Sequence, residues 1–546
     1  MIINVIFKKS LSLHKSVTKV HAYKKQELCF IITCSLTNVK RVKNMAVIWL
    51  LSLLFLISIL ITAVKRTKQS DGRQPPSPPG LPFIGNLHQL GPLPHQSLWE
   101  LSKKYGPVML VKLGRVPTVV VSSPDTAKQV LRDHDLNCCS RPSVEGARKL
   151  SYNFRDIAFS RYDDYWKELR KLCVMELFST KQVNLIQPIK KMEMKKLIHS
   201  ITESAYKKTP VNLSETYLSL NANVVCKASF GVSFQGTVLN NEKFQALVHE
   251  AIEMLGSFSA SDFFPYIGWI FDWFTGLHAR RERSVRDLDA FYEQMIDLHL
   301  QKNREERSED DFVDLLLKLE KEEAVLGYGK LTRNHIKAIL MNILLGGINT
   351  SAITMTWAMA ELARNPRVMK KVQSEIRDQI GKNKEARIIS LDETDKLKYL
   401  KMVIKETWRL HPVSPLLVAR EVISEFKING YTIQPKTRLH VNTWGTGRDP
   451  EIWKDPKEFI PERFMDRDIE ANGQHFELLP FGGGRRICPA MYMGATTVEF
   501  GLANLLYQFD WKIPEGVEDV DMDEASGLTS HKKHDLLLVP VKSFDF

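Results

Sequence analysis

The longest run of hydrophobic positions in the chain lies near its N-terminus. Residues 46–64 read AVIWLLSLLFLISILITAV and carry no charge. A stretch of about 20 apolar residues is long enough for a helix to cross a bilayer. The run ends in Lys65, Arg66 and Lys68, which suits a stop at the membrane surface, whereas a cleaved signal peptide ends in small residues. The pattern therefore predicts a transmembrane anchor over residues 45–64.

Beyond the anchor, the pattern predicts a small sheet within a helical domain. The runs VMLVKLG (108–114) and TVVVSS (118–123) are rich in β-branched residues. KINGYTI (427–433) predicts a hairpin that turns at Asn429-Gly430. Most of the remaining chain has helical periodicity. The expected fold is therefore mainly α with a small β lobe.

One predicted helix is much longer than the others. It runs from about Thr332 to Asn365, so it would be about 50 Å long at ~1.5 Å per residue. Residues 338–362 are apolar on nearly every side, which predicts burial. A second transmembrane span is the alternative, but the polar residues of this helix would be costly in lipid. They are Asn342, Asn349, Thr350, Ser351, Thr354, Thr356 and Glu361. A buried core helix with a polar notch is the better interpretation.

The charge of the chain is concentrated at its N-terminus. The net charge is +13, and residues 1–44, with nine Lys or Arg and one acid, account for +8 of it. A nucleic-acid-binding protein would carry a basic face within its fold, so we expect no nucleic-acid partner. The seven cysteines form no CxxC pair, which argues against a secreted disulfide framework and favours a reducing compartment.

These features divide the chain into four parts. Residues 1–44 are a basic extension, which we interpret as an artefact of the gene model, with translation starting at Met45; a transit extension is the alternative. Residues 45–64 are the anchor, residues 65–82 are a basic hinge stiffened by prolines, and residues 83–546 are the main domain. Under the positive-inside rule, the basic hinge places the main domain in the cytosol, although the basic residues before the anchor oppose this orientation.

The segment PFGGGRRICPA is the strongest candidate for chemistry. It contains Phe481-x-x-Gly484-x-Arg486-x-Cys488, and residues 491–506 then read as a helix. Glycines allow close approach to a flat ligand, the start of a helix favours a thiolate, and Arg486 can neutralise a carboxylate. A buried structural cysteine is the alternative. A phosphate-binding loop does not fit, because GxxxxGK[ST] is absent from this segment.

Three further motifs are weak when each is taken alone. ExxR at Glu406 and Arg409 places an ion pair on one helical face, as many exposed pairs do. PERF alone indicates a turn, and Trp166-x-x-x-Arg170 alone indicates a surface pair. With the cysteine segment and the phrases LGGINTS and KETWRLHP, they occur in the order and at the spacings of one family. Over about residues 75–541 the chain resembles a cytochrome P-450, specifically of the large plant microsomal A-type group.

The resemblance implies a fold and a cofactor. The family fold is one large, mainly α domain with a small β lobe, here residues 83–546 behind the anchor, and it binds haem b. Cys488 is implied as the axial thiolate ligand of the haem iron, whose electron donation favours O–O cleavage. The other residues implied to bind haem are Phe481 and Gly484 of the same loop and, near the propionates, Trp166, Arg170, Arg486 and, more weakly, Arg420. Glu406, Arg409 and Arg463 are implied as a structural triad that holds the cysteine loop.

The resemblance also explains the polar notch of the long helix. Residues 346–351 are implied to lie over the iron, where an acid and a threonine help to deliver protons. In this chain Asn349 replaces the usual acid, which leaves Thr350 and ordered water to carry most of the delivery. Gly346 replaces the usual alanine, which should only widen the groove for oxygen.

The implied function is that of a monooxygenase. It inserts one oxygen atom from O2 into a lipophilic small molecule, such as a plant specialised metabolite, with electrons from NADPH through NADPH-cytochrome reductase. The implied location is the endoplasmic reticulum membrane, as a single-pass protein in contact with membrane lipid and with its domain facing the cytosol. By analogy, substrate contacts come from the groove helix and from near residues 149–156, 413–418 and 527–529.

Two other functions stay open. A reductase-independent haem-thiolate synthase or isomerase is the first, although such relatives tend to lose the threonine or to enlarge the cysteine loop. A non-catalytic, membrane-bound haem binder is the second. Consumption of NADPH with the reductase, measured with and without substrate, would separate all three functions.

The stretch FFPYIGWIFDWF, residues 263–274, allows two interpretations. By family position it resembles the loop between two helices that often dips into the membrane. By composition it also suits core packing.

Overall fold

A computed structural model of the chain describes residues 73–543, apart from residues 232–240, 302–309, 328, 382–386 and 526, together with Trp49, Ser52, Leu53 and Phe55. Residues 72–546 form one compact unit. The predicted basic extension, most of the predicted anchor and residues 65–72 of the hinge lie outside the described residues.

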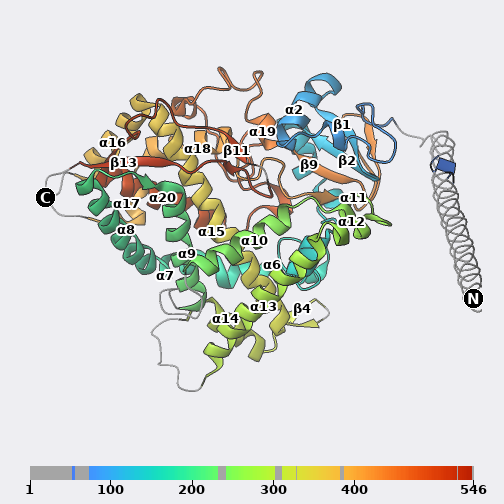
Figure 1. The fold of residues 1–546 in the computed structure, drawn as a ribbon, viewed down its shortest axis with the longest axis horizontal. Helices are drawn as coiled ribbons and strands as arrows, with labels where there is room; N and C mark the ends of the chain where they lie inside the picture. The colour runs from blue at the N-terminus through green and yellow to red at the C-terminus, as the bar shows by residue number, and fades with distance from the viewer. Residues whose placement is uncertain are drawn as a thin grey trace, which may run out of the picture. The chain divides into compact units, whose positions relative to one another are not determined.

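The described unit is mainly α-helical (Figure 1). Its longer helices are α2 (Pro94–Tyr105), α6 (Asp164–Leu172), α8 (Gln187–Lys207), α9 (Leu213–Phe230), α10 (Asn241–Gly256), α13 (Leu277–Leu300), α14 (Phe312–Lys321), α15 (Arg333–Arg364), α16 (Pro366–Ile380), α18 (Lys398–Leu410) and α20 (Met491–Gln508). Its shorter helices are η1 (Leu87–Gln89), α3 (Pro124–Lys128), η2 (Gln129–Asp133), α4 (Asp135–Cys138), α5 (Glu145–Leu150), η3 (Cys173–Leu177), α7 (Thr180–Leu185), α11 (Ala260–Phe263), α12 (Gly268–Phe274), α17 (Leu391–Thr394), α19 (Thr443–Thr446), η4 (Pro461–Phe464) and η5 (Gly484–Arg486).

The strands form one four-stranded sheet and several smaller ones. They are β1 (Val108–Leu113), β2 (Val116–Val121), β3 (Val211–Asn212), β4 (Val325–Leu326), β5 (Gly329–Lys330), β6 (Arg420–Glu421), β7 (Phe426–Ile428), β8 (Tyr431–Ile433), β9 (Arg438–Val441), β10 (Phe509–Lys512), β11 (Glu524–Ala525), β12 (His531–Lys532) and β13 (Leu537–Lys542). The largest sheet has the order β1-β2-β9-β6, in which only β2 and β9 are parallel. The smaller sheets are β10-β13-β3, β11-β12, β4-β5 and β7-β8.

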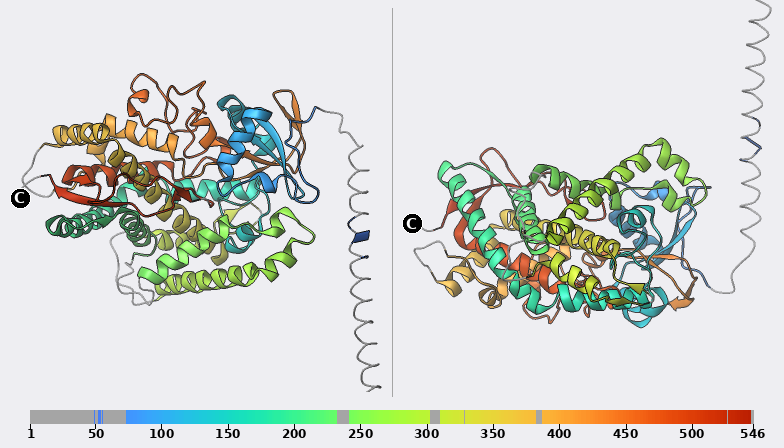
Figure 2. Two further views of the ribbon diagram at one scale, coloured as in Figure 1. Left: turned by 45° about the horizontal axis from the view of Figure 1, so that its top comes forward. Right: turned by 90° about the horizontal axis from the view of Figure 1, so that it is seen from below.

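The predicted β lobe is confirmed. The two β-branched runs form β1 and β2, although β2 begins two residues earlier than the pattern suggested. The expected hairpin is β7–β8, and its turn residues Asn429 and Gly430 both have positive φ (47° and 79°), as a tight two-residue hairpin turn requires. Both views of Figure 2 show the blue strands of the early chain beside orange strands of the late chain.

The predicted long helix is α15, and it lies in the core rather than in a membrane. Thr332 and His335 form a capping box at its start, and Pro366 begins the next helix directly after its end. Among the described residues, α15 is the one helix long and apolar enough to span a bilayer, and 72% of its most apolar window is buried. Figure 1 shows α15 in the middle of the unit, where it contacts α9, α18 and α20.

Candidate active site

The cysteine segment forms a tight loop before α20. Cys488 N donates to Phe481 O at 3.0 Å, and Ile487 N donates to Gly484 O at 3.1 Å. The ring of Phe481 packs edge-on against the ring of Trp408, with 5.2 Å between the ring centres. Since Trp408 lies on α18, this contact holds the loop against the core.

Gly484 is a position in this loop where only glycine fits. Its φ is +65°, and a Cβ atom there would stand 2.2 Å from the carbonyl oxygen of Leu131. Glycine accepts both the left-handed backbone and the close approach. Any larger residue would push the loop away from η2.

Cys488 differs from the other described cysteines in its exposure. It is half-buried, whereas Cys138, Cys139, Cys173 and Cys226 are buried. Burial raises the pKa of the Cys488 thiol, and the N–H of Ala490 and the charge of Arg170 only partly oppose this. The sequence argument that the helix start favours a thiolate is therefore outweighed by burial. A bound metal ion would reverse the balance, because a coordinated thiol is deprotonated.

Three buried or partly buried arginines gather beside this loop: Arg141, Arg420 and Arg486. Arg486 donates to the carbonyl oxygens of Cys139 (2.8 Å) and Ser160 (2.7 Å), while its buried Nη1 has no hydrogen-bond partner among the described residues. Burial, together with the charge of Arg420, lowers the pKa of Arg486 to about 10. A buried guanidinium with an unpaired N–H stabilises an anionic group that binds there.

Arg420 is occupied differently from the other two. Its Nη1 lies 2.5 Å from Oδ1 of Asp135, and its Nη2 donates to Gly483 O at 2.8 Å. Asp135 also accepts from the backbone N–H of Arg485. Arg420 therefore reaches the cysteine loop, but its charge is already balanced by a buried carboxylate.

Trp166 and Arg170 lie together on α6, beside the same loop. Trp166 Nε1 donates to Ile157 O at 2.9 Å, and the Arg486 guanidinium lies 3.9 Å from the centre of the indole. Arg170 Nη2 donates to Ile487 O at 2.7 Å. The Trp-x-x-x-Arg motif thus supports Arg486 and the residue before Cys488.

Arg141 is a site residue that the sequence did not reveal. It is buried, and it donates to the carbonyl oxygens of Ala158 and, on another segment, Val418 and Ala419. Burial and the charge of Arg486 lower its pKa. Its partners lie 17 and 277 residues away, so no local motif marks it.

The polar notch of α15 contains an open space. Gly346 is exposed within this buried helix, and, apart from its chain neighbours and the adjacent helix backbone, no described atom lies within 4 Å of the position of a Cβ on it. Thr350 Oγ1 donates to Gly346 O at 2.7 Å. Asn349 Nδ2 donates to Thr529 Oγ1 at 3.3 Å. The structure therefore places both predicted catalytic residues, Asn349 and Thr350, next to the open space at Gly346.

The segments expected to contact substrate are tied to α15 or to one another. Asn342 of α15 donates to Asp156 Oδ2 at 3.0 Å, which holds the end of segment 149–156. Thr529 bonds Asn349, as described above, and Ser530 N donates to Val413 O at 2.8 Å. Residues that are distant in sequence therefore surround one region of α15.

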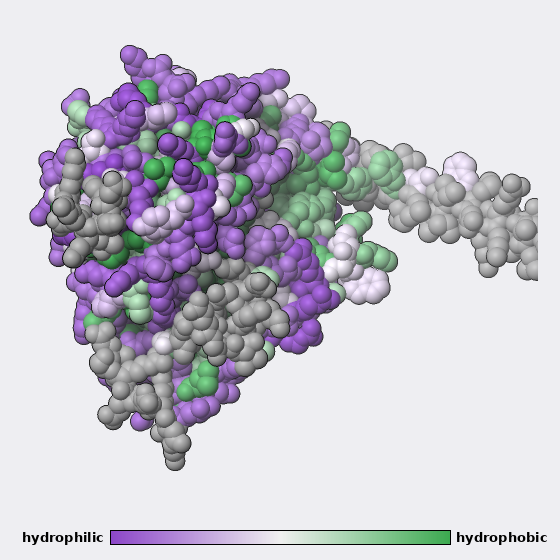
Figure 3. Space-filling view, turned by 60° about the vertical axis from the view of Figure 1, so that its left-hand side comes forward, coloured by the Kyte–Doolittle hydropathy of each residue, from purple (hydrophilic) through white to green (hydrophobic). Residues whose placement is uncertain are grey.

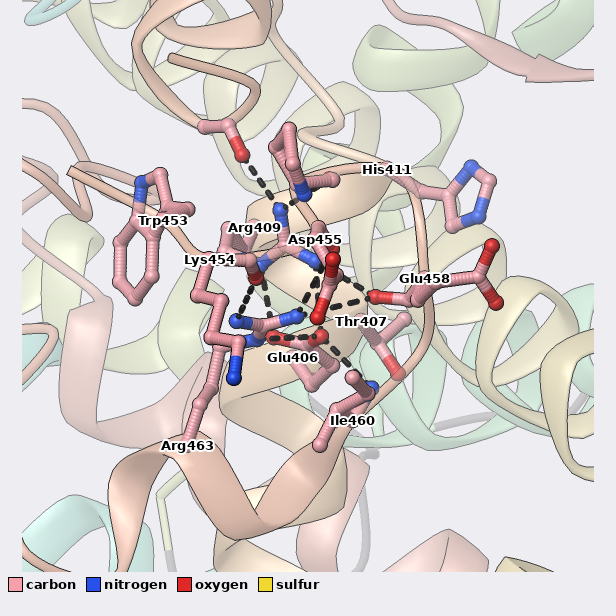
Figure 4. Close-up of polar contacts among 12 residues, drawn as sticks. Glu406, Thr407, Arg409, His411, Trp453, Lys454, Asp455, Glu458, Ile460 and Arg463 are labelled. Atoms are coloured by element: carbon pink, nitrogen blue, oxygen red, sulfur yellow. Dashed lines mark hydrogen bonds and ion pairs between the residues drawn. The ribbon is translucent and has the colours of Figure 1, made fainter. Parts of the chain in front are cut away.

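The predicted triad is assembled (Figure 4). Arg409 Nε and Nη2 each lie 2.7 Å from a different oxygen of Glu406, and Arg463 Nε lies 2.9 Å from Glu406 Oε1. The side chains of Glu406 and Arg409 are fully buried. Further bonds from the two arginines reach the carbonyl oxygens of Gly447, Lys454, Asp455, Pro456 and Glu458. The triad thus fixes the segment after α19, and Trp408 makes the contact with the cysteine loop.

The aromatic stretch 263–274 is exposed, so the core-packing interpretation is wrong. The face in Figure 3 is mostly hydrophilic, but this stretch presents large apolar side chains to solvent. They are Tyr266, Ile267, Trp269, Ile270, Phe271, Trp273 and Phe274. Asp272 turns inward and accepts bonds from Ser259 and Ser261, which orients α12 with its apolar side outward.

Known proteins match the chain along most of its length. The family model described as Cytochrome P450 matches residues 75–539. Cytochrome P450 71B10 of Arabidopsis thaliana is 82% identical over 501 residues, which cover 91% of this chain and 100% of that protein. Cytochrome P450 71B34 of the same plant is 71% identical, covering 91% of this chain and 99% of that protein. A solved structure of zebra fish cytochrome P450 with abiraterone shares the fold, with a TM-score of 0.69 and 22% identity over 82% of this chain and 99% of that one. The chain therefore belongs to the cytochrome P450 family, to its plant A-type group, whose members are oxidoreductases that bind haem b through a cysteine thiolate.

Proposed function

We propose that this chain is a membrane-anchored monooxygenase that inserts one oxygen atom from O2 into a lipophilic plant specialised metabolite, with electrons from NADPH through a reductase. The observation that carries the proposal is the half-buried Cys488 close to Arg486, whose buried Nη1 has no partner among the described residues. One group is suited to ligate iron, and the other is suited to bind a carboxylate of the same cofactor.

The loop and its arginines fit haem b. Cys488 would ligate the iron, and Arg486 and Arg141 would neutralise the propionates. When bound, haem supplies the iron at which O2 is reduced, and the thiolate favours O–O cleavage. The indole of Trp166 would hold the guanidinium of Arg486 in place, since the two are in contact. Arg170 would fix the loop at Ile487, the residue before the iron ligand.

The remaining haem-binding assignments follow from the same contacts. Phe481 and Gly484 would keep the loop in shape, through the contact with Trp408 and the close approach to η2. Arg420 would act mainly through Asp135 and Gly483, because its charge is already paired. We therefore expect Arg141, rather than Arg420, to matter more for the propionates.

Thr350 is proposed to deliver protons during O2 reduction. Its hydroxyl lies one helical turn from Gly346 and donates to the Gly346 carbonyl oxygen. Rotation of the hydroxyl away from that carbonyl would direct its proton into the open space. An amide has no proton to relay at neutral pH. Asn349 would therefore orient water and, through its bond to Thr529, hold the pocket wall.

Thr350→Ala should uncouple NADPH consumption from product formation. Without the hydroxyl, proton delivery is less ordered, and we expect product per NADPH to fall by roughly tenfold, with hydrogen peroxide released instead. The matched control is Thr356→Ala, which removes another hydroxyl that bonds the carbonyl four residues earlier on α15. Product, NADPH and peroxide are measured together. Unchanged coupling in Thr350→Ala would place the proton route elsewhere.

A second function, a reductase-independent synthase or isomerase, is tested directly. The holoenzyme is supplied with its reductase and NADPH, and the rate of NADPH oxidation is followed with and without lipophilic plant metabolites. A monooxygenase consumes NADPH faster when its substrate binds. Conversion of a hydroperoxide or another substrate without any NADPH would favour the alternative instead.

The pocket segments support an uncharged, lipophilic substrate. Residues 413–418 and 527–529 contain no charged residue. In the third segment Lys149 pairs with Glu282 at 2.7 Å, and the buried Asp156 accepts from backbone N–H groups and Asn342. Because two of the three segments carry no charge and Lys149 is already paired, a charged substrate would lose its hydration with little compensation.

The exposed aromatic residues of α12 support contact with membrane lipid. Trp269 and Trp273 are more than 60% exposed, and tryptophan favours the membrane–water interface. With an anchor at residues 45–64 and a basic hinge at 65–82, we propose a single-pass protein of the endoplasmic reticulum. Its haem domain, residues 83–546, would face the cytosol.

Expression from Met45 should give full membrane targeting and activity. The alignments to relatives leave out about as many residues as the basic extension 1–44 contains, and the charge of that extension opposes the proposed orientation. Both start sites are compared by protease protection on microsomes. A soluble Met45 form, or a haem domain protected in the lumen, would contradict the proposed topology.

A further inference from the structure

The helix that carries Glu406 and Arg409 ends at a buried histidine between two carboxylates. His411 Nε2 lies 2.7 Å from Glu361 Oε1, and His411 Nδ1 lies 4.0 Å from Glu524 Oε1. The imidazole also stacks on the indole of Trp357, with 4.1 Å between centres and 6° between planes. These contacts come from two parts of the chain, α15 and the segment around Glu524, and His411 joins both to the end of α18.

Both ring nitrogens of His411 face a carboxylate, Nε2 that of Glu361 and Nδ1 that of Glu524. His411 Nδ1 is buried and has no hydrogen-bond partner among the described residues, whereas buried polar atoms are nearly always paired. Glu524 is the group that faces it. Its Oε1 lies 4.0 Å from Nδ1, so the ring lies between two carboxylates.

Glu524 is itself held firmly. It accepts from His95 Nε2 at 2.9 Å, from Gln96 Nε2 at 3.3 Å and from Trp444 Nε1 at 3.4 Å. Burial alone would raise its pKa, but the bond from His95 and the charge of His411 outweigh burial and lower the pKa to about 2. Glu524 is therefore a fixed negative charge that links α2 and α19 to the strand that it begins.

That strand leads directly to the pocket. Glu524 pairs with Lys532 in the β11–β12 hairpin, whose tip contains residues 527–530. At the tip, Thr529 accepts from Asn349 of α15, and Ser530 donates to Val413, two residues after His411. Glu361, the other partner of His411, lies about three turns beyond Thr350 on α15. The same three chain segments thus meet twice, once at His411 and once at the notch.

We propose that His411 is a positioning residue. It sets how far two segments lie from α15, namely the tip of the β11–β12 hairpin and the segment after α18. In this way it shapes the wall of the substrate pocket. This inference rests on the proposed function, in which residues 527–529 and 413–418 contact substrate. His411 touches no substrate itself. It acts through Glu361 and Glu524, because moving either carboxylate would shift one side of the pocket against the other.

The test uses two ligands that bind haem iron and differ in size. Imidazole is small and binds mainly through its bond to the iron. Clotrimazole is an imidazole with three aryl rings, which would also contact the pocket wall. Both are titrated into the holoenzyme and followed by the shift of the Soret band. In His411→Gln and in the nearly isosteric Glu524→Gln, we expect clotrimazole to bind about tenfold more weakly, while the Kd of imidazole changes less than about twofold. The matched control is His534→Gln, an exposed histidine after the same hairpin, which should change neither Kd.

A double-mutant cycle separates positioning from general stability. Thr529→Ala removes the tip contact with Asn349. If His411 acts through the tip, the effect of Thr529→Ala on clotrimazole binding should shrink in the His411→Gln background, because the two changes disturb one wall. Glu524→Gln alone carries the test should His411→Gln fail to fold.

Several results would overturn the inference. These are additive effects in the cycle, equal weakening of imidazole and clotrimazole, or a lower melting temperature with both Kd values unchanged. Wild-type protein that binds clotrimazole no tighter than imidazole would show that this wall does not line the pocket. Failure of the proposed function is distinguishable, because wild-type protein would then consume no NADPH with the reductase whatever the variants do.

Discussion

Cys488→Ser is expected to abolish oxygenase activity. A hydroxyl is not a thiolate, so the electron donation that favours O–O cleavage is lost. Cys488 is the only cysteine among the described residues of the loop before α20. In the wild type, the reduced, carbon-monoxide-bound form should show the red-shifted Soret band of thiolate ligation, and Cys488→Ser should lose that band.

A buried cysteine provides the matched control for this loss. Cys226 lies on α9, which packs against α15, and its side chain is 1% exposed. Cys226→Ser should cost some stability, since it buries a hydroxyl in an apolar site, but it should keep the band and the activity. If Cys488→Ser kept the thiolate band, the assignment of the iron ligand would be wrong. If Cys226→Ser lost the band as well, the test would be reporting misfolding.

The elements that the sequence predicted correctly are those with strong local signals. The course of α15 follows from its apolar faces and from Thr332 and Pro366 at its ends. The β7–β8 turn follows from Asn429-Gly430, because these residues accept positive φ. Periodicity and turn chemistry act between neighbours, so a single sequence reports them well.

The contacts that the sequence did not predict join distant segments. Arg141 reaches carbonyl oxygens 277 residues away, and Arg420 pairs with Asp135, 285 residues away. The sequence therefore missed Arg141 and could not distinguish a paired Arg420 from a free one. Likewise, the helix start before Cys488 was visible, but the burial that raises the pKa of its thiol depends on the packed fold.

The triad is intermediate between features with a local sequence signal and contacts that join distant segments. The spacing of Glu406 and Arg409 is local, but the resemblance to a family was needed to add Arg463. The triad is expected to have a large effect on the stability of the fold. Glu406 accepts from Arg409, Arg463 and the backbone N–H of Ile460, all without exposure of its own side chain. One buried carboxylate therefore faces two guanidinium groups and is the only acidic side chain paired with either of them among the described residues.

Glu406→Ala should cost about 3–5 kcal/mol of stability, because it leaves buried guanidinium charge without compensation. A domain of marginal stability would lose much of its folded population, and the segment around Trp408 that supports Phe481 would loosen. We therefore expect low haem content per molecule rather than slow turnover by a fully loaded enzyme. Haem content and the melting temperature measure the effect.

The matched control is Glu462→Ala, which removes a carboxylate nearer the surface, from the PERF motif that also supplies Arg463. Glu462 accepts from Arg367, Lys371 and Tyr399, and its side chain is 23% exposed. Solvent can hydrate the arginine and lysine that it leaves behind, so its removal should cost at most about 1 kcal/mol and leave haem content near that of the wild type. Full haem loading with slow catalysis in Glu406→Ala would show that Glu406 acts in the reaction. Equal losses in both variants would show that burial of the triad does not decide the effect.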